Sequence, residues 1–163
     1  MPSGRQDPFV EALKQTFLIH LRRRYEPMIL VNLPGIRGDS KIPGHVGEIE
    51  FDTYRFGNLN RDPDAGRNSV LAYDLILTKR KDSSSPRFME FFMSGKQIPR
   101  GEMLVVSRIP GTEAKQSLLY GMEDLFISYY LPKVVHDPSG SIYTEDIGIN
   151  FKKVMTAISR SGM

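Results

Sequence analysis

Three consecutive serines, Ser83, Ser84 and Ser85, are the residues of this chain that first suggest chemistry. A serine hydroxyl can act as a nucleophile, and serines in a glycine-rich loop can help to bind phosphate. Neither a Gly-x-Ser-x-Gly elbow nor the glycines and lysine of a phosphate-binding loop surround them, and no histidine is close in sequence. A serine before Pro86 instead favours a helix start, in which a hydroxyl accepts a capping hydrogen bond. We therefore predict that the serines are structural.

Two histidines and an acidic row are the other candidates for chemistry. His45 and His136 each stand beside turn residues without a third ligand at a recognisable spacing, so they make a weak metal site. Glu48, Glu50 and Asp52 could form a pair of carboxylates for acid and base catalysis. Their strict alternation with apolar residues indicates instead the solvated or interface face of a strand. We predict no catalytic residue, no metal site and no cofactor.

Composition and charge limit the class of protein. The chain has 163 residues, of which 40% are hydrophobic, enough for one globular domain with a core. The absence of cysteine excludes disulfides, thiolate metal sites and cysteine nucleophiles. The formal net charge is +3, and residues 1–27 supply +2 of it, with five basic residues against three acidic ones. The remainder is nearly neutral, which gives little reason to expect nucleic acid as a partner.

Residues 1–27 differ from the rest of the chain. Asp7 as N-cap, Pro8 in the first turn and apolar residues three and four apart predict an amphipathic helix. Such a helix could dock on a partner or a membrane surface, or it could be an extension outside the domain, which we favour. The apolar stretch 17–21 is too short to span a membrane, and its arginines follow rather than precede it. We expect neither a signal peptide nor membrane insertion.

From Met28 onward the hydrophobic period becomes about two, which predicts strands separated by turns. The strand runs are 28–33, 46–56, 70–81, 103–109, 117–131 and 146–158. The fifth run is long enough to bend or bulge near Gly121. In the third run Leu71, Tyr73, Leu75 and Leu77 share one face, while Ala72 and Ile76 lie on the other. Useful apolar surface on both faces suggests that one side of the sheet meets another subunit.

One helix interrupts the strands, directly after the serines. Asp82, Ser85 and Pro86 are predicted to hold the turn between strand and helix, and Gly95 lies past the helix end. Phe88, Phe91 and Phe92 are spaced three and four apart, so their rings are predicted to share one face that packs on a sheet or plugs a barrel end. The pattern as a whole predicts a mainly β fold, a barrel or sandwich with one inserted helix.

Five segments in order carry a resemblance to a known family: "MILVNLPGIRGDSK", "HVGEIEFDTYRFG", "TKRKDSSSPRFMEFFMSGKQI", "LLYGMEDLFISYYL" and "TEDIGINFKKVMTAI". Together they resemble the Hcp (hemolysin-coregulated protein) family of bacterial type VI secretion over residues 28–163. The last segment contains the family's asparagine-phenylalanine-lysine step at residues 150–152. Position 47 is glycine, and the tryptophan often found near it in the family is absent. Residues 1–27 have no counterpart, so we expect an Hcp-like domain at 28–163 and an alternative start or added sequence before it.

The resemblance implies a β-barrel of two antiparallel sheets with one short helix, assembling into a homohexameric ring. Rings would stack into the tube that the contractile apparatus expels, and small effectors would travel in the ring lumen. The implied partners are the tube-tip spike protein, the sheath and the baseplate components. The implied location is the bacterial cytoplasm during assembly, followed by secretion to the outside without a signal peptide.

A long polar loop, "GNLNRDPDAGRNS" at residues 57–69, connects two predicted strands. Loops of this length in compact domains tend to be functional. We predict that it projects from the ring and contacts the next ring or a neighbouring subunit, although a merely floppy hairpin connection would give the same pattern. The residues expected to supply polar contacts are Arg61, Asp62, Asp64 and Arg67.

Two functions of other classes are compatible with the residues. A small-ligand-binding β-barrel without enzymatic activity would need a cavity, and a purified monomer that carries a ligand would favour it. A hydrolase would act through Ser85 or through the Glu48 and Glu50 row, and substitution of those residues would abolish its activity.

Overall fold

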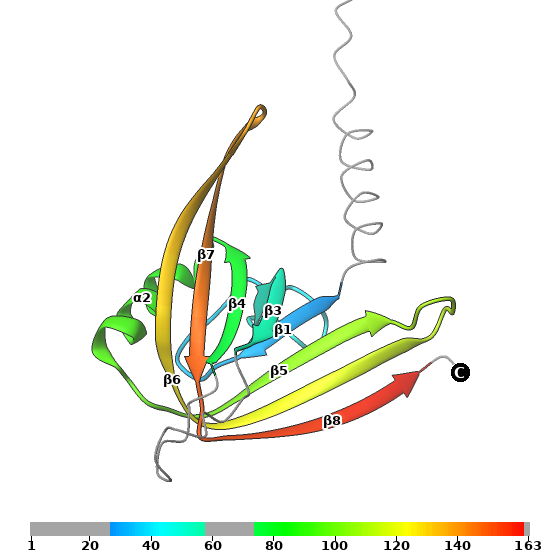
Figure 1. The fold of residues 1–163 in the computed structure, drawn as a ribbon. Coiled ribbons are helices and arrows are strands. Elements are labelled where there is room, and N and C mark those ends of the chain that lie inside the picture. The colour runs from blue at the N-terminus through cyan, green and yellow to red at the C-terminus, as the bar shows by residue number, and fades with distance from the viewer. Residues whose placement is uncertain (1–26, 58–73, 162–163) are drawn as a thin grey trace, which may run out of the picture.

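The computed structural model describes residues 27–57 and 74–161. Its elements are β1 (Met28–Asn32), β2 (Ile49–Phe51), β3 (Thr53–Phe56), β4 (Asp74–Arg80), α2 (Ser85–Ser94), β5 (Ile98–Arg108), β6 (Lys115–Asp137), β7 (Gly140–Asn150) and β8 (Lys153–Ser161). The prediction of a mainly β, antiparallel fold with one inserted helix is confirmed over these residues (Figure 1). None of the helical residues described forms a helix long and apolar enough to cross a membrane.

One long strand, β6, belongs to both halves of the sheet. Its first half pairs with β5 on one edge and β8 on the other, and its second half pairs with β7. The strand order is β2-β1-β5-β6-β7-β4-β3, with β8 attached to β6. Figure 1 shows β6 turning from one half of the sheet into the other. The two halves are therefore one continuous hydrogen-bonded structure.

The change of direction in β6 falls later than the predicted position at Gly121. Asp124 has a φ of 53°, and the register with β7 shifts between Ile127 and Tyr129. A left-handed residue and a bulge each re-aim a strand. The bend was therefore predicted in the right strand and near Gly121, and it falls a few residues later because glycine is not the only residue that can adopt this conformation.

Two predicted single strands are each two strands that meet at a corner. The run 46–56 divides at Asp52 into β2, which pairs with β1, and β3, which pairs with β4. The run 146–158 divides at residues 151–152, where β7 ends and β8 begins. The amides of Asp52 and Lys152 donate to backbone carbonyls of β4 and β6, so each corner stays hydrogen-bonded. A period of two continues through such a corner, so the sequence pattern alone did not locate it.

The core lies between the two halves of the sheet and beneath α2. On β4 it contains Leu75 and Leu77, both fully buried, whereas Leu71 and Tyr73 lie outside the described residues. Its main members are Ile29, Val31, Ile49, Phe51, Leu75, Leu77, Phe88, Phe91, Ile98, Met103, Val105, Met122, Leu125, Ile127, Ile147 and Ile149.

Helix α2 packs on this core through two of its three phenylalanines. Phe88 and Phe91 are buried, and the Phe88 ring meets that of Phe51 edge-on with centroids 6.1 Å apart. Phe92 is 37% exposed, and its ring centroid lies 6.5 Å from that of Tyr130. The helix ends as predicted at Gly95, whose φ is 65° and whose amide donates to a carbonyl of the last turn.

We expect Phe91→Ala to lower the free energy of unfolding by about 3–5 kcal/mol, because it removes a fully buried ring and leaves a cavity. Met93→Ala is the matched control on the same helix, since that side chain is 77% exposed, and it should change stability by less than about 0.5 kcal/mol. Urea unfolding at one fixed protein concentration, followed by circular dichroism, measures both. Similar losses for the two variants would contradict this packing of α2.

Candidate functional site

A buried ion pair joins β4 to β7. Lys79 Nζ lies 2.5 Å from Glu145 Oε1, and the two side chains are 2% and 0% exposed. The two residues face each other across neighbouring strands. Sequence reasoning missed this pair, because the two residues are far apart along the chain. The signal was present, since the period of two places Lys79 on the same strand face as Leu75 and Leu77.

The turn between β4 and α2 closes around this pair. The Ser85 hydroxyl donates to Glu145 Oε1 at 2.8 Å and accepts from the Asp82 amide at 3.0 Å. Asp82 Oδ1 lies 2.7 Å from Lys79 Nζ and also accepts from the Ser84 amide at 2.9 Å. The predicted side-chain cap is not made: Ser84 precedes the helix, but its hydroxyl donates back to Asp82. Pro86 occupies the first turn.

Tyr130 completes the coordination of Glu145. Its hydroxyl donates to Glu145 Oε2 at 2.5 Å, so both carboxylate oxygens have partners. Burial, and then the hydrogen bond to this carboxylate, raise the pKa of Tyr130 above its ordinary value. We call the set of Lys79, Asp82, Ser85, Tyr130 and Glu145 the clamp. It connects β4, the start of α2, β6 and β7 through side chains.

The clamp does not have the geometry of a serine hydrolase, even though Lys79 Nζ lies 3.4 Å from the Ser85 hydroxyl. A nucleophilic serine needs a neighbouring base that accepts its proton, and it must be reachable by substrate. Here the lysine is ion-paired with two carboxylates, and the serine donates its proton to Glu145. Ser85 is only 8% exposed. The arrangement is that of a structural cross-link.

A second polar contact ties the loop after β1 to the same turn. Both the amide and the hydroxyl of Ser83 donate to the Asp39 carboxylate, the amide at 3.1 Å. These two hydrogen bonds lower the pKa of Asp39 below its ordinary value. Each of the three serines therefore bonds an acidic side chain: Ser83 bonds Asp39, Ser84 bonds Asp82 and Ser85 bonds Glu145.

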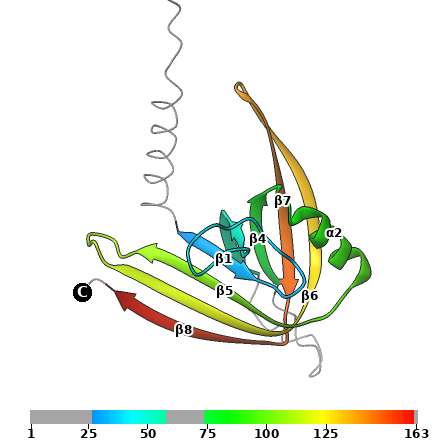
Figure 2. The same ribbon diagram turned by 180° about the vertical axis from the view of Figure 1, so that it is seen from behind.

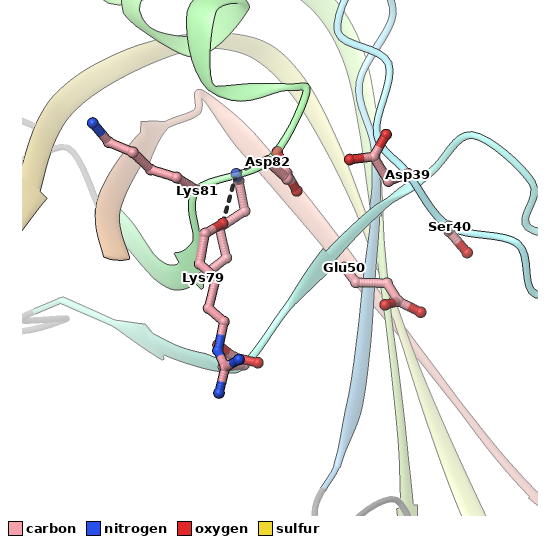
Figure 3. Close-up of a pocket in the computed structure, with 8 residues that line it drawn as sticks. Asp39, Ser40, Glu50, Lys79, Lys81 and Asp82 are labelled. Carbon is pink, nitrogen blue, oxygen red and sulfur yellow. Dashed lines mark hydrogen bonds and ion pairs between the residues drawn. The ribbon is translucent and has the colours of Figure 1, made fainter. Parts of the chain in front are cut away.

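A polar cavity of about 240 Å³ lies beside the clamp. Figure 3 shows Lys79 and Lys81 on one side of it and Asp39, Ser40 and Glu50 on the other. The lining residues are Asp39, Ser40, Glu50, Asp52, Lys79, Arg80, Lys81 and Asp82. Four acidic and three basic side chains thus share a small space, and their opposite charges nearly cancel. The cavity has no predominantly cationic or anionic character that would select a charged ligand.

The predicted acidic row and the histidines do not combine into a centre. Glu48 is paired with His45, with Oε2 and Nδ1 2.6 Å apart, whereas Glu50 lines the polar cavity. His136 lies on a different element, where its Nδ1 is 2.8 Å from the Ser141 hydroxyl. Among the residues that the structure describes, no group of three or more histidine, aspartate or glutamate side chains could hold a metal ion.

Strand β8 presents the first of two exposed apolar surfaces. It pairs with β6 along one edge, and none of its residues belongs to the buried core cluster. Val154, Met155 and Ile158 are 38%, 58% and 63% exposed. Exposed apolar surface on a strand at a sheet edge is typical of a protein–protein interface.

The second apolar surface is the hairpin formed by residues 131–143, the end of β6 and the start of β7, which we call the arm. Figure 1 shows that it projects beyond the rest of the sheet. Val134 and Val135 are 46% and 49% exposed, and Tyr143 is 56% exposed. The strands stay paired to the tip, where Asp137 faces Gly140. The arm is therefore an ordered ribbon with apolar side chains in solvent.

Two predictions concern residues outside the described part of the chain. The polar loop contacts assigned to Arg61, Asp62, Asp64 and Arg67 fall in residues 58–73, and the extension assigned to 1–27 falls almost wholly in 1–26. Both stay predictions.

Comparison with known proteins agrees with this architecture. The model of the family described as "Type VI secretion system effector, Hcp" matches residues 30–157. Hcp1 from Salmonella typhimurium is similar, with a TM-score of 0.62 and 23% identity over 82% of this chain and 93% of that chain.

Two further solved structures share the fold at lower identity. Hcp1 from the E. coli EAEC 042 pathovar has a TM-score of 0.60 and 17% identity over 85% of this chain and 99% of that chain. A chain of the PVC sheath–tube complex, from an extracellular contractile injection system in its extended state, has a TM-score of 0.50 and 12% identity over 83% and 90%. A search of curated proteins gives no match.

We expect Lys79→Met to lower the free energy of unfolding by about 3–5 kcal/mol, because it leaves Glu145 charged and buried without its cation. The matched control is Arg87→Met, which breaks a pair with Glu90 whose side chains are 55% and 60% exposed, and it should cost about 1 kcal/mol or less. Urea unfolding measures both. Adding Glu145→Gln to Lys79→Met should restore part of the loss, and a double variant no better than the single one would contradict the ion-pair assignment.

Alkaline pH should weaken the fold through Tyr130. In the unfolded chain a tyrosine ionises near its ordinary pKa of about 10, whereas in the folded chain the pKa of Tyr130 is raised. Its contribution to stability is therefore complete below about pH 10 and is lost progressively as the pH rises above that value. The stability difference between the natural chain and Tyr130→Phe should be constant from about pH 7 to 9 and shrink toward about pH 11. Tyr143→Phe on the exposed arm is the control, and a difference for Tyr130→Phe that does not change with pH would refute the assignment.

Proposed function

The chain belongs to the Hcp family of the type VI secretion system, and from that premise we propose that it acts as a structural subunit that closes into rings of six copies. As a member of this family it is a tube component of the secretion apparatus. Its role is then to present surfaces to other copies of itself rather than to turn over a substrate.

The observation that carries the proposal is the pair of apolar surfaces on β8 and on the arm. They are different surfaces on one chain, so a contact between them is heterologous. A heterologous contact repeated through a rotation that closes gives a cyclic ring. Apolar side chains such as Ile158, 63% exposed, are then covered only in the assembly.

The two alternatives from the residues gain no specific support. A small-ligand site is usually a mostly apolar pocket, but the cavity in Figure 3 is lined mainly by charged side chains. A hydrolase through Ser85 would need a free base, and the lysine beside it is ion-paired. We therefore propose a non-enzymatic role.

Further partners follow from the family and belong to the same proposal. The rings stack into a tube that meets a spike at its tip, a sheath around it and a baseplate beneath it, and small effectors travel in the lumen. Likeness to a chain of a sheath–tube complex supports the stacking at the level of the fold. Assembly in the bacterial cytoplasm precedes export, and the loop at 57–69 contacts the next ring or a neighbouring subunit through Arg61, Asp62, Asp64 and Arg67.

Solution mass tests the ring. At tens of micromolar, light scattering should give about 111 kDa, six times the 18.5 kDa chain, and negative-stain images should show rings. The chain beginning at Met28 should give the corresponding hexamer. Ile158→Asp should lower the ring fraction at least tenfold, because it places a charge in the buried part of the contact. Met93→Asp, at an apolar position on α2 that is 77% exposed, is the control and should leave the ring intact.

A monomer or dimer for both chain lengths would refute the ring. Intact rings in Ile158→Asp would leave the ring standing but remove β8 from its interface.

A further inference from the structure

We propose that, within the proposed ring on which this inference rests, the arm of each copy reaches over the neighbouring copy and packs on that neighbour's β8. The partner of the arm is a second copy of this chain. The contact joins one particular face of the arm to one particular face of β8.

The arm and β8 lie on opposite sides of the molecule. In Figure 1 and in the reverse view of Figure 2 the arm is the uppermost described element and β8 the lowermost, with β1 and β5 between them. Each copy can therefore extend an arm to one neighbour and receive an arm from the other. This is the head-to-tail arrangement that a closed ring requires.

The two apolar surfaces face the same way as the core. On β7, Tyr143 precedes buried Glu145 at a spacing of two, and Val134 lies opposite Tyr143, so both point to the core side of the sheet. On β8, Val154 lies opposite buried Met122, so Val154 also points to the core side. Ile158 shares that face, four residues further along.

The apolar side chains of the arm and of β8 lie on the core-facing side of the sheet, but beyond the region in which the two halves of the sheet cover each other. Val134 and Tyr143 are 46% and 56% exposed, and Val154 and Ile158 are 38% and 63% exposed. Within one copy the core-facing sides of the two halves pack on each other. An arm laid over the next copy's β8 repeats that packing between copies, so each uncovered surface covers the other.

The arm is built to hold its direction without a neighbour. The clamp fixes its base, because Glu145 faces Pro132 across the two strands. At its tip Asp137 Oδ1 accepts from the Ser139 amide at 2.7 Å. A two-stranded hairpin alone is only marginally stable in water. Because the clamp and the turn already hold the arm in place, the arm loses less conformational freedom when it binds.

Charge favours the same pairing. Residues 151–161 contain Lys152, Lys153 and Arg160 and no acidic residue. The tip of the arm carries Asp137, whose carboxylate accepts from the amide and the hydroxyl of Ser139. A basic strand and an acidic tip are complementary, which suits an interface between them.

Disulfide trapping tests the contact directly, because the chain has no cysteine of its own. Two full-length variants with tags of different size are co-expressed, one with a cysteine on the arm and one with a cysteine on β8, and then oxidised. Since each chain carries a single cysteine, a mixed disulfide forms only between copies. The core-side pairs join Val134→Cys or Tyr143→Cys to Val154→Cys or Ile158→Cys.

The matched control uses the opposite faces of the same strands, Val135→Cys with Met155→Cys, which are 49% and 58% exposed. We expect at least one core-side pair to give at least tenfold more mixed disulfide than the control pair. Light scattering on each unoxidised mixture shows whether rings are present. Rings with no core-side disulfide, or with an equal yield from the control pair, would overturn the arm contact and leave the ring standing. Absence of rings in all mixtures would overturn the ring and this inference together.

Discussion

The buried pair of Lys79 and Glu145 is the interaction on which the rest of the arrangement depends. Two charges removed from water cost several kcal/mol each unless they are paired and fully hydrogen-bonded. Here one carboxylate oxygen of Glu145 pairs with Lys79 and accepts a hydrogen bond from Ser85, and the other accepts one from Tyr130. The requirement is therefore met. Because those partners come from β4, from the start of α2 and from β6, meeting the requirement also fixes how these elements lie on β7.

The path of β6 explains why apolar surface remains outside the core. One strand serves both halves of the sheet, so β8 pairs with its first half while β7 pairs with its second. Both halves continue past the region in which they face each other, which leaves β8 on one side and the arm on the other (Figures 1 and 2). In a compact monomeric domain these extra strand residues would only expose apolar surface to solvent. In a subunit whose neighbours repeat the same geometry, they can pack against the next copy.

The sequence was informative where a single local rule decides the outcome. A period of two marks strands, and glycine after a helix marks its end, so the strand-rich class, the inserted helix and its end at Gly95 could all be predicted. The corners at Asp52 and at residues 151–152 could not, since alternation continues through them. The expectation of a ring-forming assembly came from the family resemblance, which rests on the order of five segments, because no local rule predicts assembly.

The clamp shows a different limit of sequence reasoning. Its serines were predicted to act through a local cap, whereas the observed interaction is a hydrogen bond from Ser85 to Glu145, 60 residues away. Alternation placed Lys79 on the apolar face of its strand, yet a lysine in a basic run is ordinarily exposed. Only the register between β4 and β7, which brings Glu145 opposite, makes the inward position favourable. Strand pairing is a non-local property.

In the proposed ring, strand β8 has to remain soluble before assembly and become buried after it. Its composition fits both states, since Lys152, Lys153 and Arg160 flank the apolar residues in 151–161 without any acidic residue. Charges at a sheet edge discourage indiscriminate pairing with other edges, and like-charged β8 strands repel each other. The strand is therefore biased against symmetric contact with another β8 and toward a surface of different character. That bias is what a head-to-tail ring needs, because a symmetric contact would stop at a dimer.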